Sequence, residues 1–314
     1  MHAVTVDDGA LVFAERPDPE PGPGQVLVAV RAAGVNGADL LQRRGFYPAP
    51  PGSPPDIPGL ELAGEVVALG PDVAAWQVGD RVMSIVGGGG QAELAVVDGS
   101  VALPVPAAMG WAEAGGFSEV FCTAHDALVT QAGLQAGERV LVTGAAGGVG
   151  TAGVQLAAAM GAEVVASVRR PELHGALSEL GAAIVVEPDG VAGAGPYDVV
   201  LELVGAASLP AALGALADGA RVVVIGVGGG ARIELDLLAL MGRRARIGGS
   251  TLRARSTEGK AAVTQAVRRD VLPMLASGRV RVPVAATFPM AEATAAYERF
   301  AAGGKVGKIV LVNT

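Results

Sequence analysis

The sequence has little cysteine, little charge and few aromatic side chains. A single cysteine, Cys122, stands among 314 residues, which excludes an intramolecular disulfide and a four-thiolate zinc site. Only 17% of the residues are charged and the net charge is −8, so no basic field would attract nucleic acid or anionic lipid. Aromatic residues make up 4%, too few for base-stacking platforms. We therefore expect neither a nucleic-acid partner nor a membrane partner.

Apolar residues, in contrast, are abundant. They make up 51% of the chain, which excludes a disordered protein, and the length suggests two domains. The N-terminus lacks a basic start followed by an apolar core, so no signal peptide is predicted and a cytoplasmic protein is expected. The uncharged run 140–162 has the length of a membrane span, but its six glycines favour a buried strand, turn and helix.

The pattern of apolar runs changes along the chain. Short Val-rich runs in the first third, separated by Gly, Pro and Asp, indicate strands and turns. From about residue 139, wholly apolar strands alternate with helices, which is typical of a parallel, doubly wound sheet. A helix over 257–277 is predicted to leave this region, and the tail is predicted to rejoin the first domain. We thus expect a catalytic domain at 1–120, a cofactor domain at 121–255 and a return segment at 256–314.

A glycine-rich segment, VLVTGAAGGVGTAG, follows a predicted strand and opens a predicted helix. Small residues in that position let the backbone approach a pyrophosphate, and the helix N-terminus offers free N–H groups. Three glycine motifs overlap here, but the short-chain dehydrogenase motif is rejected because none of the three tyrosines has a lysine four residues later. The predicted cofactor contacts in this turn are Gly144, Gly147, Gly148, Val149 and Gly150.

The second strand of this unit identifies the expected cofactor. An NAD site places Asp or Glu about 20 residues after the turn to bind the ribose 2′-OH. This chain has Arg169 and Arg170 there, and a guanidinium can bind a 2′-phosphate in a bidentate manner. The sequence therefore predicts NADPH. Further contacts are predicted at the carboxyl ends of later strands, where ligands bind in such sheets: Gly226, Val227, Thr251, Leu252 and Arg253.

Taken together, a strand-rich domain, an internal dinucleotide fold and a returning tail resemble the medium-chain dehydrogenase/reductases. The family's zinc ligands are replaced here by Val35-Asn36 and Gly59-Leu60-Glu61. The zinc-free members with a Gly-Val-Asn-x-x-Asp motif are the quinone oxidoreductases, also called zeta-crystallin-like. The chain resembles them through AAGVNGADLLQRRGFYPAPPGSPPDIPGLELAGEV, VLVTGAAGGVGTAGVQLA and VGKIVLVN, and it is most similar to the branch of the tumour-suppressor-inducible quinone oxidoreductase.

This resemblance implies an α/β protein with a GroES-like catalytic domain and a Rossmann domain. It also implies NADPH, no metal, and a homodimer or homotetramer built partly on sheet edges of the cofactor domain. Asn36 and Tyr47 are implied to lie over the nicotinamide as candidate catalytic residues. Asn36 also suits a helix cap, Tyr47 also suits a packing role, and solvent is an alternative proton source. Thr123 is implied to contact the nicotinamide, and Lys308 to reach either the cofactor or the surface.

Three functions follow from these expectations. The first is NADPH-dependent reduction of quinones by direct hydride transfer, without metal or flavin. The second is reduction of α,β-unsaturated carbonyls such as enoyl thioesters or alkenals, because both substrates are conjugated acceptors. The third belongs to another class: a non-catalytic NADPH-binding protein, crystallin-like or RNA-binding, which the acidic charge disfavours.

Overall fold

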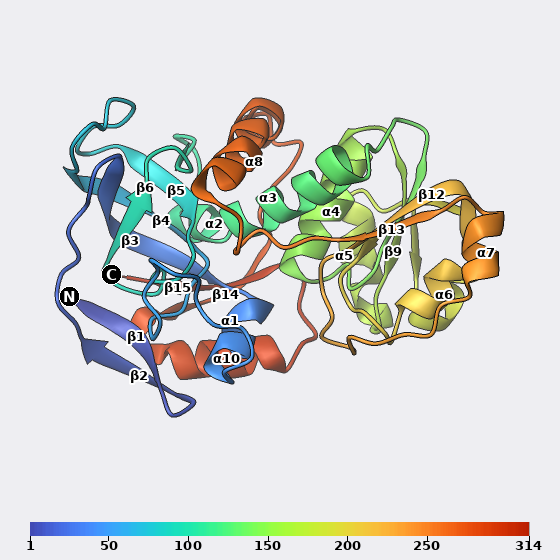
Figure 1. Cartoon of the computed structure of the whole chain (residues 1–314), viewed down its shortest axis with the longest axis horizontal. Coiled ribbons are helices and arrows are strands. Elements are labelled where there is room, and N and C mark those ends of the chain that lie inside the picture. The colour runs from blue at the N-terminus through green and yellow to red at the C-terminus, as the bar shows by residue number, and fades with distance from the viewer. Residues whose placement is uncertain (314) are drawn as a thin grey trace.

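The computed structural model describes residues 1–313 and has two lobes, one at each end of its long axis (Figure 1). The first lobe is built on a seven-stranded sheet, most of it antiparallel, in which β6 pairs with β3 beside the main strand order. Its strands, in spatial order, are β14 (Val284–Pro289), β15 (Lys308–Val312), β3 (Gln25–Val35), β4 (Glu61–Leu69), β5 (Arg81–Ile85) and β7 (Leu103–Pro104), with β6 (Leu94–Asp98). A hairpin of β1 (His2–Asp7) and β2 (Ala10–Glu15) forms a separate two-stranded sheet, joined to the segment before β6 by a bridge between Ala3 and Ala92.

The second lobe is a six-stranded sheet in which every neighbouring pair is parallel. In spatial order its strands are β10 (Ile184–Val186), β9 (Glu163–Ser167), β8 (Arg139–Val142), β11 (Tyr197–Glu202), β12 (Leu216–Val224) and β13 (Arg246–Gly249). In chain order this is 3-2-1-4-5-6, the Rossmann arrangement, with its topological switch between β8 and β11. Its helices are α4 (Gly148–Ala159), α5 (His174–Glu179), α6 (Leu209–Leu213) and α7 (Leu237–Gly242). The expected α/β fold is confirmed.

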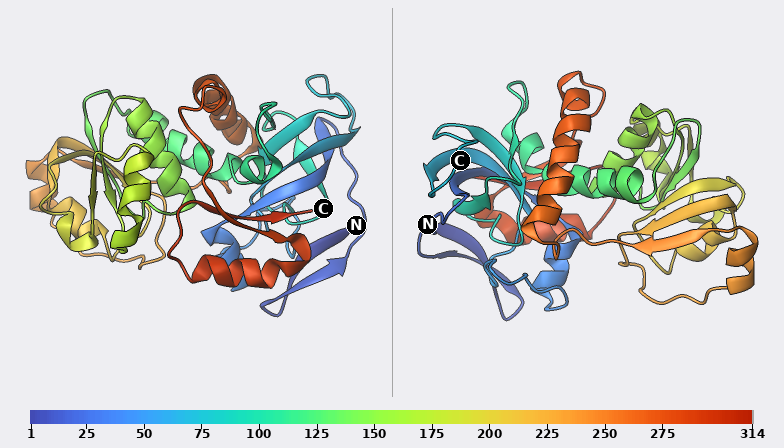
Figure 2. Two further views of the ribbon diagram at one scale, coloured as in Figure 1. Left: turned by 180° about the vertical axis from the view of Figure 1, so that it is seen from behind. Right: turned by 45° about the horizontal axis from the view of Figure 1, so that its top comes forward.

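The C-terminal segment lies in the first lobe, among its N-terminal strands (Figure 2). β15 pairs with β3, and α10 (Ala293–Ala301) packs against β14 and β15. One expectation was wrong: the helix over 257–277 is divided into α8 (Thr257–Asp270) and α9 (Leu272–Ala276). Pro273, at the start of α9, lacks the N–H that a continuous helix needs.

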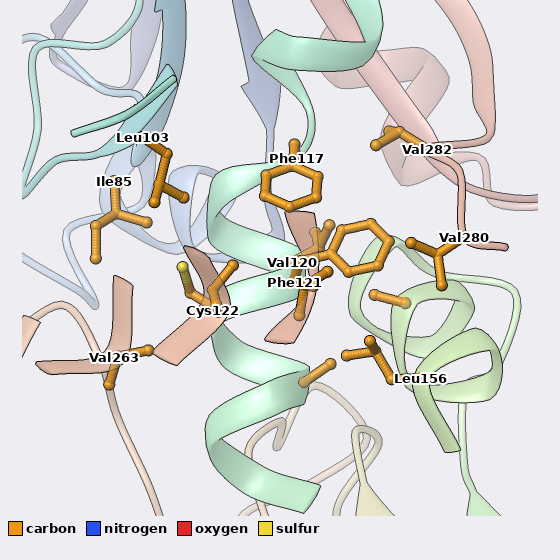
Figure 3. Close-up of a cluster of buried hydrophobic side chains, with 14 of the residues drawn as sticks. Ile85, Leu103, Phe117, Val120, Phe121, Cys122, Leu156, Val263, Val280 and Val282 are labelled. Atoms are coloured by element: carbon orange, nitrogen blue, oxygen red, sulfur yellow. The ribbon is translucent and has the colours of Figure 1, made fainter. Parts of the chain in front are cut away.

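Three further helices lie at the junction or beside the first sheet: α1 (Gly37–Arg43), α2 (Trp111–Gly115) and α3 (Ser118–His125). The junction is a continuous apolar core around α3 (Figure 3). The rings of Phe117 and Phe121 stack with centroids 4.6 Å apart. Ile85 packs in this cluster from the first sheet and Leu156 from α4, so α3 joins the two lobes by shared packing. Cys122 is fully buried here, as expected of a small apolar residue.

Within residues 1–313, no helix is both long and apolar enough to cross a membrane.

Candidate functional site

The glycine turn connects β8 to α4 at the switch point of the parallel sheet. Gly147 caps α4 in an extended conformation, and the first turn of a helix leaves its N–H groups without helical acceptors. Gly144 has a positive φ of 57°, which glycine tolerates best. A Cβ on Gly150 would lie 2.6 Å from Gly144 O, and one on Gly153 would lie 2.6 Å from Leu201 Cδ2. Gly150 is therefore required for close backbone approach within the turn, and Gly153 for close packing of the helix against β11.

Gly147, unlike Gly148 and Gly150, has room for a Cβ atom. A Cβ there would lie 3.4 Å from its nearest neighbour, Gly144 O, so the protein itself leaves room on that side of the turn. A cradle that is open at Gly147 and lined by helix N–H groups fits a dinucleotide pyrophosphate.

Two loops border this cradle. Ala145 N donates to Ser167 O at the end of β9 (3.1 Å), so the turn lies directly beside the predicted 2′-phosphate residues. Gly307 N donates to Ala146 O (2.9 Å), which brings the loop before β15 from the first lobe onto the same turn.

Arg169 and Arg170 are both exposed beyond the end of β9. The Arg170 guanidinium lies so close to Gly304 that a Cβ there would meet Nη1 at 2.2 Å. Next to it, Lys305 donates to Gly307 O, and burial together with Lys308 and Arg299 lowers the pKa of Lys305 to about 8. Sequence reasoning missed Lys305, because its distance from Arg170 along the chain hides their proximity in space.

Lys308 is buried in the first lobe and is not a surface residue. Its Nζ contacts Glu61 Oε1 at 2.7 Å and donates to Asn36 Oδ1 (2.6 Å) and Val35 O (3.0 Å). Both ionic side chains are nearly inaccessible, at 3% for Lys308 and 0% for Glu61. A Cβ on Gly148 would lie 2.7 Å from Lys308 Cδ. The side chain of Lys308 therefore passes beneath the first residue of α4.

Asn36 belongs to the same network and also begins α1. Its Nδ2 donates to Glu61 Oε1 (3.0 Å), and its backbone N donates to Asp39 Oδ2 (2.8 Å). Asp39 Oδ1 accepts from Gly59 N (3.1 Å). Burial raises the pKa of Asp39 to about 7 in spite of these bonds. Asn36 thus occupies the N-cap position of α1, but its side chain makes no capping bond and is bound by Glu61 and Lys308.

Tyr47 lies half-buried in the proline-rich loop and is held there by Arg253. Arg253 is 4% exposed, and its guanidinium carbon lies 5.0 Å from the centre of the Tyr47 ring. Arg253 also donates to Tyr47 O (2.9 Å), Gly87 O (2.7 Å) and Gln42 Oε1 (2.6 Å). The contact of Arg253 with the cofactor stays a prediction. In the structure this residue, just beyond β13, also fixes the Tyr47 loop of the other lobe.

The remaining predicted residues lie beyond the carboxyl ends of β12 and β13 and, in the case of Thr123, on α3 at the junction of the lobes. Gly226 follows β12, and a Cβ on it would lie 2.3 Å from Leu203 O. Val227 and Thr251 are exposed, whereas Leu252 and Thr123 are 7% and 8% exposed. The loop beside Gly226 is organised by Glu202, a fully buried carboxylate that sequence reasoning missed. Its Oε1 accepts from the Ser208 hydroxyl and from two backbone N–H groups.

Glu119 is a second acidic residue that sequence reasoning missed. It is half-buried in the first turn of α3, and its backbone N donates to Glu61 Oε2 (2.9 Å). Burial and the neighbouring charge of Glu61 raise the pKa of Glu119 to about 8. The signal in the sequence was that Glu119 is the one charged residue between Glu113 and His125.

A cavity of about 830 Å³ opens between the proline loop, the glycine segment 87–89 and the start of α8. Lys260 lines it and is electrostatically linked to Glu119, whose charge opposes the lowering of the Lys260 pKa by burial.

Comparison with known proteins agrees with this geometry. Residues 22–132 match the model described as alcohol dehydrogenase GroES-like domain, and residues 161–311 match the model described as zinc-binding dehydrogenase. Human quinone oxidoreductase is 30% identical over 99% of this chain and 98% of its own length. A mycobacterial protein solved in complex with NADPH is 28% identical, with a TM-score of 0.87 over 99% of this chain and 100% of that one.

Longer proteins match as well. A spectinabilin polyketide synthase protein of Streptomyces orinoci is 35% identical over 98% of this chain, which spans only 14% of that synthase.

The chain belongs to the medium-chain dehydrogenase/reductase family of oxidoreductases, whose members bind a nicotinamide cofactor and act on small molecules. Within the family it falls in the quinone oxidoreductase-like branch.

The zinc in the second family description requires a donor set that these residues do not provide. Among residues 1–313, no group of three His, Cys, Asp or Glu side chains could hold a metal ion. Glu61 and Asn36 Oδ1 bind the Lys308 ammonium instead. The residues therefore do not fit zinc, and no step below uses it.

Proposed function

We propose that this protein reduces quinones with NADPH by direct hydride transfer, without metal or flavin. One observation carries the proposal: an open glycine cradle at the switch point of a parallel sheet faces a first lobe whose polar centre is an ammonium–carboxylate pair, Lys308 and Glu61. The full-length similarity to human quinone oxidoreductase supports the substrate class.

The preference for NADPH is supported by cations around the end of β9. Arg169 and Arg170 are exposed there, and Lys305 follows the glycine against which Arg170 lies. Bidentate guanidinium contacts favour a phosphate dianion over a hydroxyl. The NADPH complex of the mycobacterial relative agrees with this assignment for a similar fold.

When bound, NADPH supplies the hydride. The chain's own task is to orient the acceptor and to stabilise the negative charge that develops on its oxygen. Tyr47 is the proposed hydrogen-bond donor, because Arg253 fixes its loop and leaves the ring half-buried. The Asn36 amide is held by Glu61 and Lys308, so Asn36 acts as part of this buried polar network.

A second candidate function is reduction of enoyl thioesters or alkenals. The 35% identity to a polyketide synthase protein over 98% of this chain favours it. Chemically the two candidates share one requirement, a conjugated acceptor whose oxygen gains charge.

The deciding experiment measures NADPH oxidation by chelator-treated protein with an ortho-quinone and, separately, with a 2-alkenal and an enoyl thioester. NADH serves as the cofactor control. We expect the turnover rate with the quinone to exceed the rates with the alkenal and with the enoyl thioester. Turnover with the alkenal or thioester alone would move the function to alkene reduction. Tight NADPH binding without turnover of any of them would leave the non-catalytic binding protein.

We also propose that a second copy of this chain covers the outer edge of the parallel sheet. β13 is the end strand and pairs only with β12 in the described sheet. Beside it, α7 exposes Leu238 and Met241 by 77% and 70% of their surfaces. An unpaired strand next to an apolar helix suits a two-fold contact in which the same elements face each other.

A further inference from the structure

We propose that Glu119 is the group that delivers the proton to the substrate after hydride transfer. This inference rests on the proposed reductase function. It names Glu119 as the proton source in place of Tyr47 or solvent.

The position of Glu119 on α3 is the first argument. Every other residue of α3 is buried, whereas Glu119 is half-buried. Thr123 lies four residues later and therefore on the same face of the helix. Thr123 is the residue of α3 proposed to contact the nicotinamide, so the proposal places Glu119 on the cofactor side of this helix.

The surroundings of Glu119 are the second argument. Its backbone is tied to Glu61, which is itself bound by Lys308. Its carboxyl interacts electrostatically with groups from several elements, and its charge in turn raises the pKa values of two of them, Tyr47 and Lys260. The groups are Glu61 on β4, Asp39 on α1, Lys308 on β15, Arg253 after β13, Tyr47 in the proline loop and Lys260 on α8.

The acidity of the two candidate donors is the third argument. Burial and Glu61 raise the pKa of Glu119 to about 8, so its carboxyl carries a proton at neutral pH. Burial and the charge of Glu119 raise the pKa of Tyr47 above its ordinary value of 10, which makes the phenol a weaker acid. A general acid is most effective when its pKa lies near the working pH.

The acceptor gains a hydride, and the electron pair displaced from its double bond moves to the carbonyl oxygen. The O–H bond of Glu119 breaks as a new O–H bond forms on that oxygen, and the bonding pair stays on the carboxylate. NADPH is oxidised, the substrate is reduced by two electrons, and solvent returns the proton to Glu119.

The first measurement needs neither cofactor nor substrate. Infrared difference spectra between wild type and Glu119→Gln, recorded from about pH 3 to 10, isolate the band of the protonated carboxyl. We expect this band to disappear with a midpoint near pH 8. A midpoint near the ordinary value of 4.5 would overturn the proposal, and equal thermal melting curves would show that the variant is folded.

The second measurement is the pH profile of kcat with NADPH and the better of the two acceptors. Wild type should lose activity as pH rises through about 8, since the acid form is lost there. Glu119→Gln should lower kcat by about 100-fold, the lower end for a general acid. It should also abolish the fall in kcat above about pH 8, with KM for NADPH changed less than twofold. Glu119→Asp should restore this alkaline limb of the pH profile in part. Glu298→Gln, an exposed carboxyl on α10, is the matched control and should leave the profile unchanged.

The outcomes separate this proposal from the one on which it rests. If wild type binds NADPH but reduces neither acceptor, the reductase function fails, whatever the carboxyl does. If wild type reduces one acceptor and Glu119→Gln does so at the same rate with the same pH limb, only the role of Glu119 fails.

Discussion

The buried ion pair of Lys308 and Glu61 is tested most directly by removing the ammonium. Lys308→Met leaves Glu61 with no cation while it is fully buried. Breaking a buried ion pair from one side costs about 3–5 kcal/mol. Glu61 keeps two other donors, Asn36 Nδ2 at 3.0 Å and Glu119 N at 2.9 Å, so the lower end, about 3 kcal/mol, is expected.

The assay is urea unfolding followed by tryptophan fluorescence. Both tryptophans, Trp76 and Trp111, lie in the first 120 residues, so the signal reports on the lobe that holds the pair. The double variant Lys308→Met/Glu61→Gln should recover most of the loss, because it leaves no uncompensated charge. Arg243→Met is the matched control. It breaks a pair that is more than half exposed on both sides, and it should cost at most about 1 kcal/mol.

A loss below about 1 kcal/mol for Lys308→Met, or a double variant no more stable than the single one, would refute the interpretation of a buried and coupled pair.

Three further predictions concern the cofactor and the assembly. Gly147→Val should fold normally, because a Cβ there lies 3.4 Å from its nearest neighbour, yet weaken NADPH binding by at least about 100-fold in a fluorescence titration; an unchanged Kd would mean that the pyrophosphate lies elsewhere. Replacing both Arg169 and Arg170 by Ala should narrow the preference for NADPH over NADH by about 1–3 kcal/mol, and an unaltered preference would contradict the 2′-phosphate assignment. Leu238→Glu combined with Met241→Glu should reduce the mass measured by light scattering to that of a monomer, whereas a mass equal to that of wild type would exclude this edge as the interface.

The parts of the molecule that could be predicted are those encoded by neighbouring residues. The turn from Gly144 to Gly150 could be located because a strand, a turn and a helix follow each other within one short segment. The parallel sheet followed from wholly apolar runs. Helix 257–277 was predicted without its break, since the apolar spacing continues through Pro273 and only the missing N–H divides it.

The polar centre of the site could not be predicted, because its partners are far apart in the chain. Lys308 and Glu61 are brought together only when β15 joins the first sheet next to β3. Arg253 likewise follows a strand of the second lobe, so its position suggested a cofactor contact, although its acceptors lie in the first lobe. Contacts that depend on how two lobes dock leave no periodic signal in the sequence.

The Arg253 anchor has a consequence for protein engineering. The proposed role of Tyr47 makes its loop a target for exchanging substrate preference, yet the loop is held by an arginine some 200 residues away, which also binds Gln42 and Gly87. A transplanted loop would arrive without its partners and would adopt many conformations. Chimeras should therefore move the loop, Gln42, the segment around Gly87 and Arg253 as one unit.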